Sequence, residues 1–344
     1  MESDSRNQIM VVDAHSDYPI QILRERHEGR TRVMERLHLP NLRAGGVVME
    51  TAVIGGDFII AGIDFRDPAI VLETLDAVYE DMSESPGLFR LITSADDLDM
   101  VGKDDKINLM LTIEGSAAIG DNLSMLRNLY RLGLRSLSLT HNPRNILADG
   151  YTEGPHAGLS YYGRALVQEA TDLNMIIDLV HINERGFYDI LDLTEQPVVV
   201  SHSNARSLCD HPRNLTDEQI KAVADRGGVV ALNFMAYTID LDVTNATLGK
   251  LLNHADHIVD LCGVNALGAG PDFVDYFIEL LIEDCKRAGE PVEMAGYVQG
   301  IENIGKMGVF IDGLSSRGYS DTDIQKIMGG NVLDLYKRIL GHDH

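Results

Sequence analysis

Eight short apolar segments, spaced along most of the chain, constrain the fold more than any other feature of this sequence. They are rich in Val, Ile and Leu, and polar segments with helical periodicity separate them. Continuous apolar character, rather than alternation of apolar and polar residues, is typical of strands covered on both faces, as in a parallel sheet. The predicted strands are residues 9–17, 46–55, 107–115, 134–142, 175–182, 197–204, 227–234 and 266–273.

The segments between these strands carry the patterns that start helices. Asp67-Pro68 places an N-cap and a first-turn proline ahead of an apolar face, and Thr216 to Gln219 forms a capping-box pattern that Ser320 to Asp323 resembles. Further helices are predicted at residues 122–132, 160–173, 184–193, 247–262 and 274–288. Strand and helix repeated eight times predict an α/β fold, a (β/α)8 TIM barrel, with residues 294–344 as additional C-terminal helices. No linker or composition break interrupts the pattern, so residues 1–344 are predicted to form a single domain.

Residues with metal-binding or acid/base chemistry stand at the C-terminal ends of six of the eight predicted strands. Enzymes built on this barrel have their site at that end. Chance would scatter such residues, because the chain has only 12 histidines, yet four of them occupy this one predicted rim. The residues are His15, Asp17, Glu114, His141, His181, His202 and Asp272.

The spacing of these residues favours a metal site. His15 and Asp17 are two residues apart, so on an extended strand both side chains point to the same side and can chelate one cation. His181 and His202 end consecutive strands, which a parallel barrel sets about 4.8 Å apart, so their imidazoles can meet at one metal. Glu114 follows an apolar run, where an unpaired carboxylate is costly, and its two oxygens can bridge two metals. Mixed nitrogen and oxygen ligands suit a borderline-soft ion such as zinc.

Each of these residues alone has an ordinary explanation: a turn, a hydrogen-bonded core histidine, or a salt-bridged glutamate. Their convergence on one rim favours a site instead. Other catalytic patterns are missing, since the sequence has no GxSxG, no P-loop and no HExxH, and Gly268-Ala269-Gly270 lacks the third glycine of a dinucleotide fingerprint. His254 and His257 share a predicted helix face, but no partner carboxylate is evident, so we interpret them as structural.

Composition excludes several classes of partner. The chain carries 29 Lys and Arg against 53 Asp and Glu, a formal charge of −24, and no basic run, which argues against nucleic acid and anionic membrane surfaces. No apolar run approaches the length of a membrane span, and the N-terminus is polar where a signal peptide would be apolar, so we expect a soluble, cytoplasmic protein. The three cysteines form no CxxC pair, which argues against a structural zinc knuckle.

Several motifs in a fixed order resemble the membrane (renal) dipeptidase family, the M19 metallopeptidases of the amidohydrolase superfamily. The resemblance runs from the first strand almost to the end of the chain. The motifs are Asp13-Ala14-His15-Ser16-Asp17, Leu39-Pro40-Asn41-Leu42-Arg43-Ala44-Gly45-Gly46, Ile113-Glu114-Gly115, Leu139-Thr140-His141-Asn142, Asp178-Leu179-Val180-His181, Ser201-His202-Ser203, His211-Pro212-Arg213-Asn214, Gly270-Pro271-Asp272-Phe273 and Gly329-Gly330-Asn331.

The resemblance implies a role for each residue of the rim. It implies two zinc ions per chain, one held by His15, Asp17 and Glu114, the other by His181 and His202, with Glu114 shared. It also implies three residues that act on the substrate: His141 at the scissile carbonyl oxygen, Arg213 at the terminal carboxylate, and Asp272 in proton transfer. Arg213 comes from the resemblance alone, because nothing in the strand pattern distinguishes it from any other loop arginine.

The implied activity is hydrolysis of a dipeptide, with a hydroxide shared by the two ions as the nucleophile and L-Xaa-D-Xaa dipeptides as the first substrates to test. An alternative keeps the site but changes the bond to another amide, such as an N-acyl amino acid or a β-lactam. A non-enzymatic binding module with a degraded site is a third reading, which the intact ligand set disfavours. Dimers are common in the family, so a homodimer is a further expectation.

Overall fold

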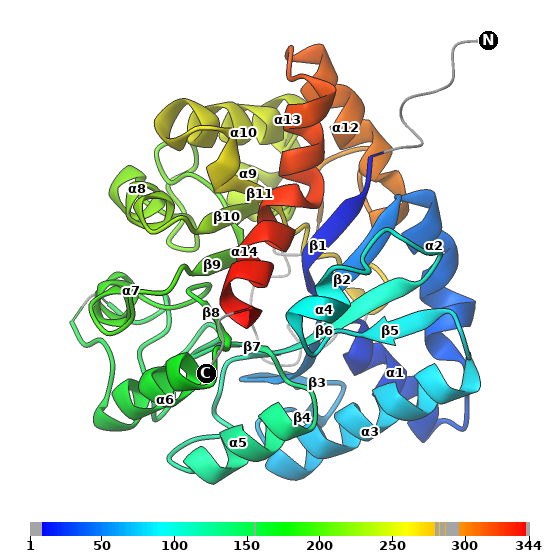
Figure 1. Cartoon of the computed structure of the whole chain (residues 1–344). Coiled ribbons are helices and arrows are strands. Elements are labelled where there is room, and N and C mark those ends of the chain that lie inside the picture. The colour runs from blue at the N-terminus through cyan, green and yellow to red at the C-terminus, as the bar shows by residue number, and fades with distance from the viewer. Residues whose placement is uncertain (1–8, 155, 279–281, 283–285, 287–295, 342–344) are drawn as a thin grey trace.

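The computed structural model describes residues 9–154, 156–278, 282, 286 and 296–341. Eight parallel strands follow one another in chain order around a nearly closed barrel, and helices surround it (Figure 1). The strands are β1 (Val11–Ser16), β2 (Val47–Gly56), β6 (Ile107–Glu114), β7 (Ser136–Ser138), β8 (Ile176–Asp178), β9 (Val199–Ser203), β10 (Val229–Leu232) and β11 (Leu267–Ala269). All eight lie within the predicted segments or one residue beyond them, and the predicted (β/α)8 fold is confirmed.

The predicted helices between the strands are also found. Asp67 caps its helix by accepting a hydrogen bond from the backbone N–H of Ala69, and Thr216 and Gln219 form both bonds of the capping box. These helices are α3 (Pro68–Glu84), α5 (Leu123–Arg131), α6 (Tyr161–Asp172), α7 (Glu184–Leu191), α8 (Asp217–Asp225), α10 (Leu248–Cys262), α12 (Met307–Ser316), α13 (Asp321–Gln325) and α14 (Asn331–Leu340). The helix predicted at residues 274–288 lies largely outside the described residues.

Several elements were not predicted. The helices among them are α1 (Tyr18–His27), α2 (Leu39–Ala44), α4 (Ala95–Leu98) and α9 (Ala236–Ile239), and the strands are β3 (Ile59–Ile60), β4 (Ile63–Asp64) and β5 (Phe89–Leu91). Most of them are too short to show a periodicity in the sequence. The longest, α1, begins directly after the first strand and carries Pro19 in its first turn. None of the described helices combines the length and the apolar character needed to span a bilayer.

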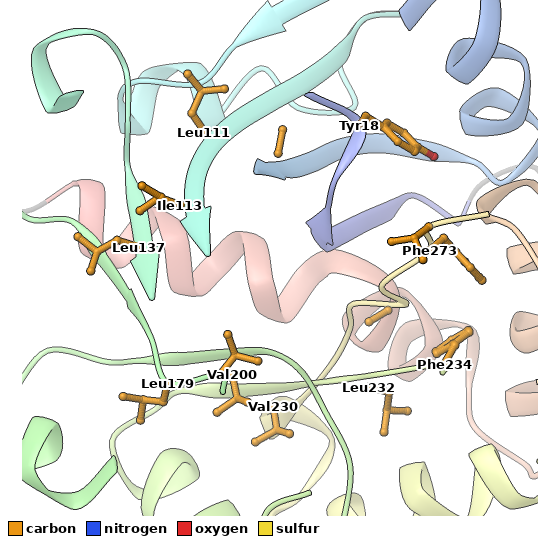
Figure 2. Close-up of a cluster of buried hydrophobic side chains, with 14 of the residues drawn as sticks. Tyr18, Leu111, Ile113, Leu137, Leu179, Val200, Val230, Leu232, Phe234 and Phe273 are labelled. Atoms are coloured by element: carbon orange, nitrogen blue, oxygen red, sulfur yellow. The ribbon is translucent and has the colours of Figure 1, made fainter. Parts of the chain in front are cut away.

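Two apolar clusters hold the barrel together. The larger one lies between the strands and the outer helices, and Figure 2 shows its residues from β6, β7, β9 and β10, such as Ile113, Leu137 and Val230. The smaller one fills the barrel interior, where Val12, Met49, Met110, Val199 and Val229 pack with Val332, Leu335, Tyr336 and Ile339 of α14. These strand residues come from the N-terminal halves of their strands, so α14 covers the end of the barrel opposite to the polar rim (Figure 1).

Glu50 of β2 gives the barrel wall a testable pH dependence. The side chain is fully buried beside Asp13, its partner in the β1–β2 register. Burial raises the pKa of Glu50 well above its ordinary value of 4.5, and Asp13 raises it further. The folded protein therefore keeps this carboxyl protonated at a pH where the unfolded chain has ionised it, so stability falls as the pH rises above 4.5.

We expect Glu50→Gln to remove this penalty. At pH 8 the variant should be more stable than the wild type, because only the wild type must take up a proton on folding, and at pH 4 the two should be nearly equal. Urea unfolding at both pH values measures the difference. A gain of the same size at both would show that ionisation of Glu50 is not its cause.

Candidate metal centre

The seven residues predicted from the strand ends all lie at the C-terminal end of the barrel. His15, Glu114 and His202 are within the last two residues of β1, β6 and β9. Asp17, His141, His181 and Asp272 follow β1, β7, β8 and β11 by one to three residues. Because the strands are parallel and neighbouring, this placement brings all seven side chains to one rim.

Sharp backbone turns direct two of these side chains. His181 and Asp272 adopt left-handed backbone conformations, with φ of 63° and 62°. Such conformations are unfavourable for residues with a Cβ and are concentrated at functional sites. Gly270, just before Asp272, passes so close to β9 that a Cβ there would lie 1.8 Å from the carbonyl oxygen of Ser201.

Glu114 lies at the centre of the cluster. Its Oε1 is 2.8 Å from Nε2 of His181, 3.4 Å from Nε2 of His202 and 3.5 Å from Nε2 of His15. Its other oxygen, Oε2, is 3.9 Å from Nε2 of His141. This carboxylate therefore lies between four imidazoles.

Asp17 and Asp272 complete the cluster on the side of β1. Nε2 of His15 is 3.8 Å from an oxygen of each, and Nε2 of His202 is 3.9 Å from the other oxygen of Asp272. Three overlapping groups have donor atoms close enough to share a metal: His15, Glu114 and His202; Glu114, His141 and His181; and His15, Asp17 and Asp272. The structure therefore gathers the seven residues but does not divide them into the two ligand sets expected from the resemblance.

Hydrogen bonds at the outer nitrogen, Nδ1, of His181 and of His202 fix the tautomer of each ring. Nδ1 of His181 is 2.9 Å from the side-chain oxygen of Asn142, an acceptor, so this nitrogen carries the proton. Nδ1 of His202 is 3.0 Å from the hydroxyl of Ser201, which hydrogen-bonds to the buried carboxyl of Asp178. In both rings the inner Nε2 is then left with its lone pair.

These lone pairs face one another at short range. Nε2 of His181 is 3.0 Å from Nε2 of His202, and both also face Oε1 of Glu114. Burial lowers the pKa of both imidazoles well below the ordinary value, and Arg213 lowers it further, so both rings stay neutral. Two neutral imidazole nitrogens and a carboxylate oxygen that converge at this range are a ligand set suited to a bound cation.

The charge of the cluster leads to the same conclusion. Burial opposes protonation of His15, yet Glu114 and Asp17 outweigh it and raise the pKa of His15 to about 10. Burial also raises the pKa of Glu114 to about 8 and that of Asp272 to about 6. Buried carboxylates with perturbed pKa values need positive charge among them, which a divalent cation supplies.

Arg213 lies beside this cluster. It is 4% exposed, donates from Nη2 to the backbone oxygen of His202 at 3.3 Å, and has its guanidinium 5.5 Å from the ring centre of Tyr151. A cavity of about 330 Å³ is lined by residues that include Tyr151, His181 and Arg213, so it borders the cluster on the side of β8 and β9. Its volume is in the range of small-molecule sites, about 300–1,000 Å³.

Sequence reasoning missed the residues that hold this cluster in place. Asn233, after β10, is fully buried and donates from Nδ2 to Oδ2 of Asp272 at 3.0 Å. Ser201 and Asp178 orient the ring of His202 through the hydroxyl of Ser201. Asp57 is the first residue after β2. The predicted strands 46–55 and 227–234 had supplied no candidate, and a search for polar residues at their ends would have found Asp57 and Asn233.

The comparisons with known proteins agree with the resemblance seen in the sequence. A model of the membrane dipeptidase family, peptidase family M19, matches residues 4–340. The dipeptidase tcpJ of Claviceps purpurea is 30% identical over 271 residues, which are 78% of this chain and 58% of that protein. This chain thus spans little more than half the length of that relative.

Solved structures of metallopeptidases share the fold. The M19 metallopeptidase dipeptidase AC is 26% identical with a TM-score of 0.82, over 97% of this chain and 99% of that one. A metallopeptidase of Rhodobacter sphaeroides, solved with a phosphinate mimic of the dipeptide L-Ala-D-Ala, is 24% identical with a TM-score of 0.82, over 96% and 99% of the two chains. With a family match over nearly its whole length and a cluster suited to a cation, the chain belongs to the membrane dipeptidase family of metallopeptidases, peptidase family M19.

Proposed function

We propose that this chain is a zinc-dependent dipeptidase that hydrolyses the single peptide bond of a dipeptide. The observation that carries the proposal is the meeting of Glu114, His181 and His202, whose donor atoms lie within 3.4 Å of one another. Family membership supports the type of bond, and the charge of the cluster supports the need for cations.

The residues present fit two zinc ions. His15 and Asp17 would hold one ion, His181 and His202 the other, and Glu114 would be shared between them. When bound, such ions lower the pKa of water and polarise a carbonyl, which makes hydrolysis possible at neutral pH. Ser201 and Asn142 keep the outer nitrogens of His202 and His181 protonated, so the inner nitrogens stay available as ligands.

Three further residues would act on the substrate. Asp272, whose pKa burial raises to about 6, accepts a proton from the attacking water and passes it to the leaving amine. Burial lowers the pKa of His141 to about 3, so its neutral ring donates a hydrogen bond to the carbonyl oxygen. Arg213 binds the terminal carboxylate, because its buried guanidinium makes few bonds of its own and has the geometry for a paired contact.

The substrates to examine first are L-Xaa-D-Xaa dipeptides. The related Rhodobacter enzyme was solved with a mimic of L-Ala-D-Ala, which supports this choice for the present chain. A polar cavity beside Arg213 gives room for the C-terminal residue next to the carboxylate that Arg213 binds.

Metal analysis combined with a stereochemically complete dipeptide screen tests the proposal. We expect about two zinc ions per chain and turnover that needs both a free amine and a free carboxylate. Hydrolysis of N-acyl amino acids or β-lactams in preference to dipeptides would instead favour the alternative amide hydrolase. A protein that holds its zinc but hydrolyses no member of the panel would contradict an enzymatic role.

Ser201→Ala should weaken zinc binding without removing a ligand. The substitution takes away the hydroxyl at Nδ1 of His202 and breaks the link to Asp178, so the imidazole loses its fixed tautomer and orientation. Loss of such an orienting group lowers metal affinity by about 10–100-fold. Competition with a chromophoric chelator measures the change.

Ser203→Ala is the matched control. Ser203 lies on the same strand two residues further on, and its hydroxyl donates to the backbone oxygen of Arg213 rather than to a ligand. Zinc affinity should be unchanged in this variant. Equal losses in the two variants would mean that β9 as a whole, rather than the Ser201 hydroxyl, controls zinc binding.

A further inference from the structure

Asp57 stands directly after β2, one of the two strands whose ends offered no candidate ligand. Its side chain is buried, with 8% of the residue exposed. Burial raises the pKa of Asp57, and several hydrogen bonds to the carboxylate act in the opposite direction. Burying a carboxyl group costs free energy unless hydrogen bonds compensate for it, so the partners of Asp57 indicate its role.

The bonds of Asp57 reach two other strand ends. Its carboxylate accepts from the backbone N–H of Ala117 at 2.8 Å and from Nδ2 of Asn145 at 2.6 Å. It also accepts from the backbone N–H of His141, and its own N–H donates to the backbone oxygen of Glu114 at 3.0 Å. One residue thus connects the end of β2 with the segments that carry Glu114 and His141.

Gly115 makes room for this arrangement. Its φ is +92°, and a Cβ at this position would lie 2.4 Å from the carboxyl carbon of Asp57. Any side chain there would push the carboxylate out of reach of its partners. The backbone next to Glu114 is therefore shaped to admit Asp57.

Asn145 extends the connection through the loop after β7. Its Nδ2 bonds both Asp57 and the backbone oxygen of Leu139, while its Oδ1 accepts from the N–H groups of Leu147 and Ala148. His141 lies inside this loop, and its side chain is 22% exposed and makes a T-shaped contact with Phe58 at 5.4 Å between ring centres. Besides this ring contact, and a second one with His181 at 4.3 Å, His141 is held by its backbone through Asp57.

We propose that Asp57 is a positioning residue for His141, which sets the distance between the His141 ring and Glu114. This inference rests on the proposed function, because it assigns His141 to the carbonyl oxygen of the substrate. Without the carboxylate, the loop that carries His141 loses its anchor while the metal ligands keep theirs. Displacing a group from its reacting geometry by about 1 Å costs on the order of a hundredfold in rate.

Asp57→Asn tests the inference. Asparagine keeps the shape of the side chain, but it replaces one carboxylate oxygen by an N–H₂ group, which cannot accept a hydrogen bond from the N–H groups that face it. We expect kcat to fall by about 10–100-fold, with KM within about twofold and the zinc content unchanged. The backbone amides of residues 139–148 should exchange hydrogen faster in the variant, a readout that needs no activity. In a His141→Ala background the same substitution should change kcat by less than about threefold, since its target is already absent.

Asp81→Asn is the matched control. Asp81 is fully buried on α3 and accepts from the backbone N–H groups of Val33 and Met34, so it is also a buried carboxylate that binds two amides. It touches none of the site residues, and its substitution should leave kcat and the exchange of residues 139–148 unchanged. If Asp57→Asn does not fold, Asn145→Asp is the alternative. It replaces the amide that donates to Asp57 by a second carboxylate, which repels that of Asp57, and the same results are expected.

Three results would overturn the inference: equal losses of kcat in the wild-type and His141→Ala backgrounds, loss of zinc in Asp57→Asn, or unchanged exchange of residues 139–148. A wild-type protein inactive on every dipeptide contradicts the proposed function instead. In that case the exchange measurement still decides whether Asp57 holds the His141 loop.

Discussion

Glu114→Gln should abolish dipeptide hydrolysis, lowering kcat/KM by about a thousandfold or more. The carboxylate of Glu114 is the nearest anionic group to His181, His202 and His15, at 2.8, 3.4 and 3.5 Å. Glutamine keeps the size of the side chain, but it has one oxygen where two are needed and carries no charge. The zinc content should fall from two ions per chain to one or none.

Glu50→Gln is the control for this experiment. Glu50 is another buried glutamate, on β2, which pairs with β6. It belongs to none of the groups able to share a metal among the described residues. The control should keep both ions and full activity, and a Glu114→Gln protein with two ions and normal turnover would rule out a bridging role for Glu114.

Asp272→Asn should lower kcat by about 10²–10⁴-fold while both zinc ions stay bound, because it removes the proton acceptor without removing a required ligand. The pKa of Asp272 is raised by burial to about 6, and nearby cations act to lower it. Asp272 can accept a proton only when it is ionised, so activity should rise with pH. This rising part of the pH profile, the acid limb, should have its midpoint at about pH 6 or below. The variant should lose that limb.

Asp275→Asn separates this role from general effects of charge. Burial also raises the pKa of Asp275 to about 6, but this residue forms no part of the metal-binding groups described above. Its variant should keep the acid limb and most of the activity. Loss of zinc from Asp272→Asn, or an unchanged acid limb, would assign Asp272 to metal binding rather than to proton transfer.

The sequence was most informative about polar residues that stand at the end of an apolar strand. His15, Glu114 and His202 end long apolar segments, so their place on the rim followed from the strand pattern alone. Arg213 lies in the loop between β9 and α8, and only the resemblance to a known family singled it out. Loops of this kind have no periodicity from which a position can be read.

The residues that orient the site were the hardest to predict. Ser201, Asn233 and Asp57 act through hydrogen bonds whose partners are 1, 39 and 60 residues away. Such bonds depend on how loops fold over the strand ends, and residue type alone does not show them. The left-handed turns at His181 and Asp272 were likewise not predicted, since such conformations are uncommon for any residue other than glycine and depend on tertiary packing.

The helix α14 also determines when the chain can finish folding. Val12 and Met49, from the first two strands, pack against Leu335 and Tyr336 of α14, far along the chain. Until α14 docks, the barrel interior remains open at one end, and its apolar lining is exposed to solvent. Contacts so distant in sequence slow folding. Docking of α14 is therefore expected late in folding, because it joins the first strands to the last described helix.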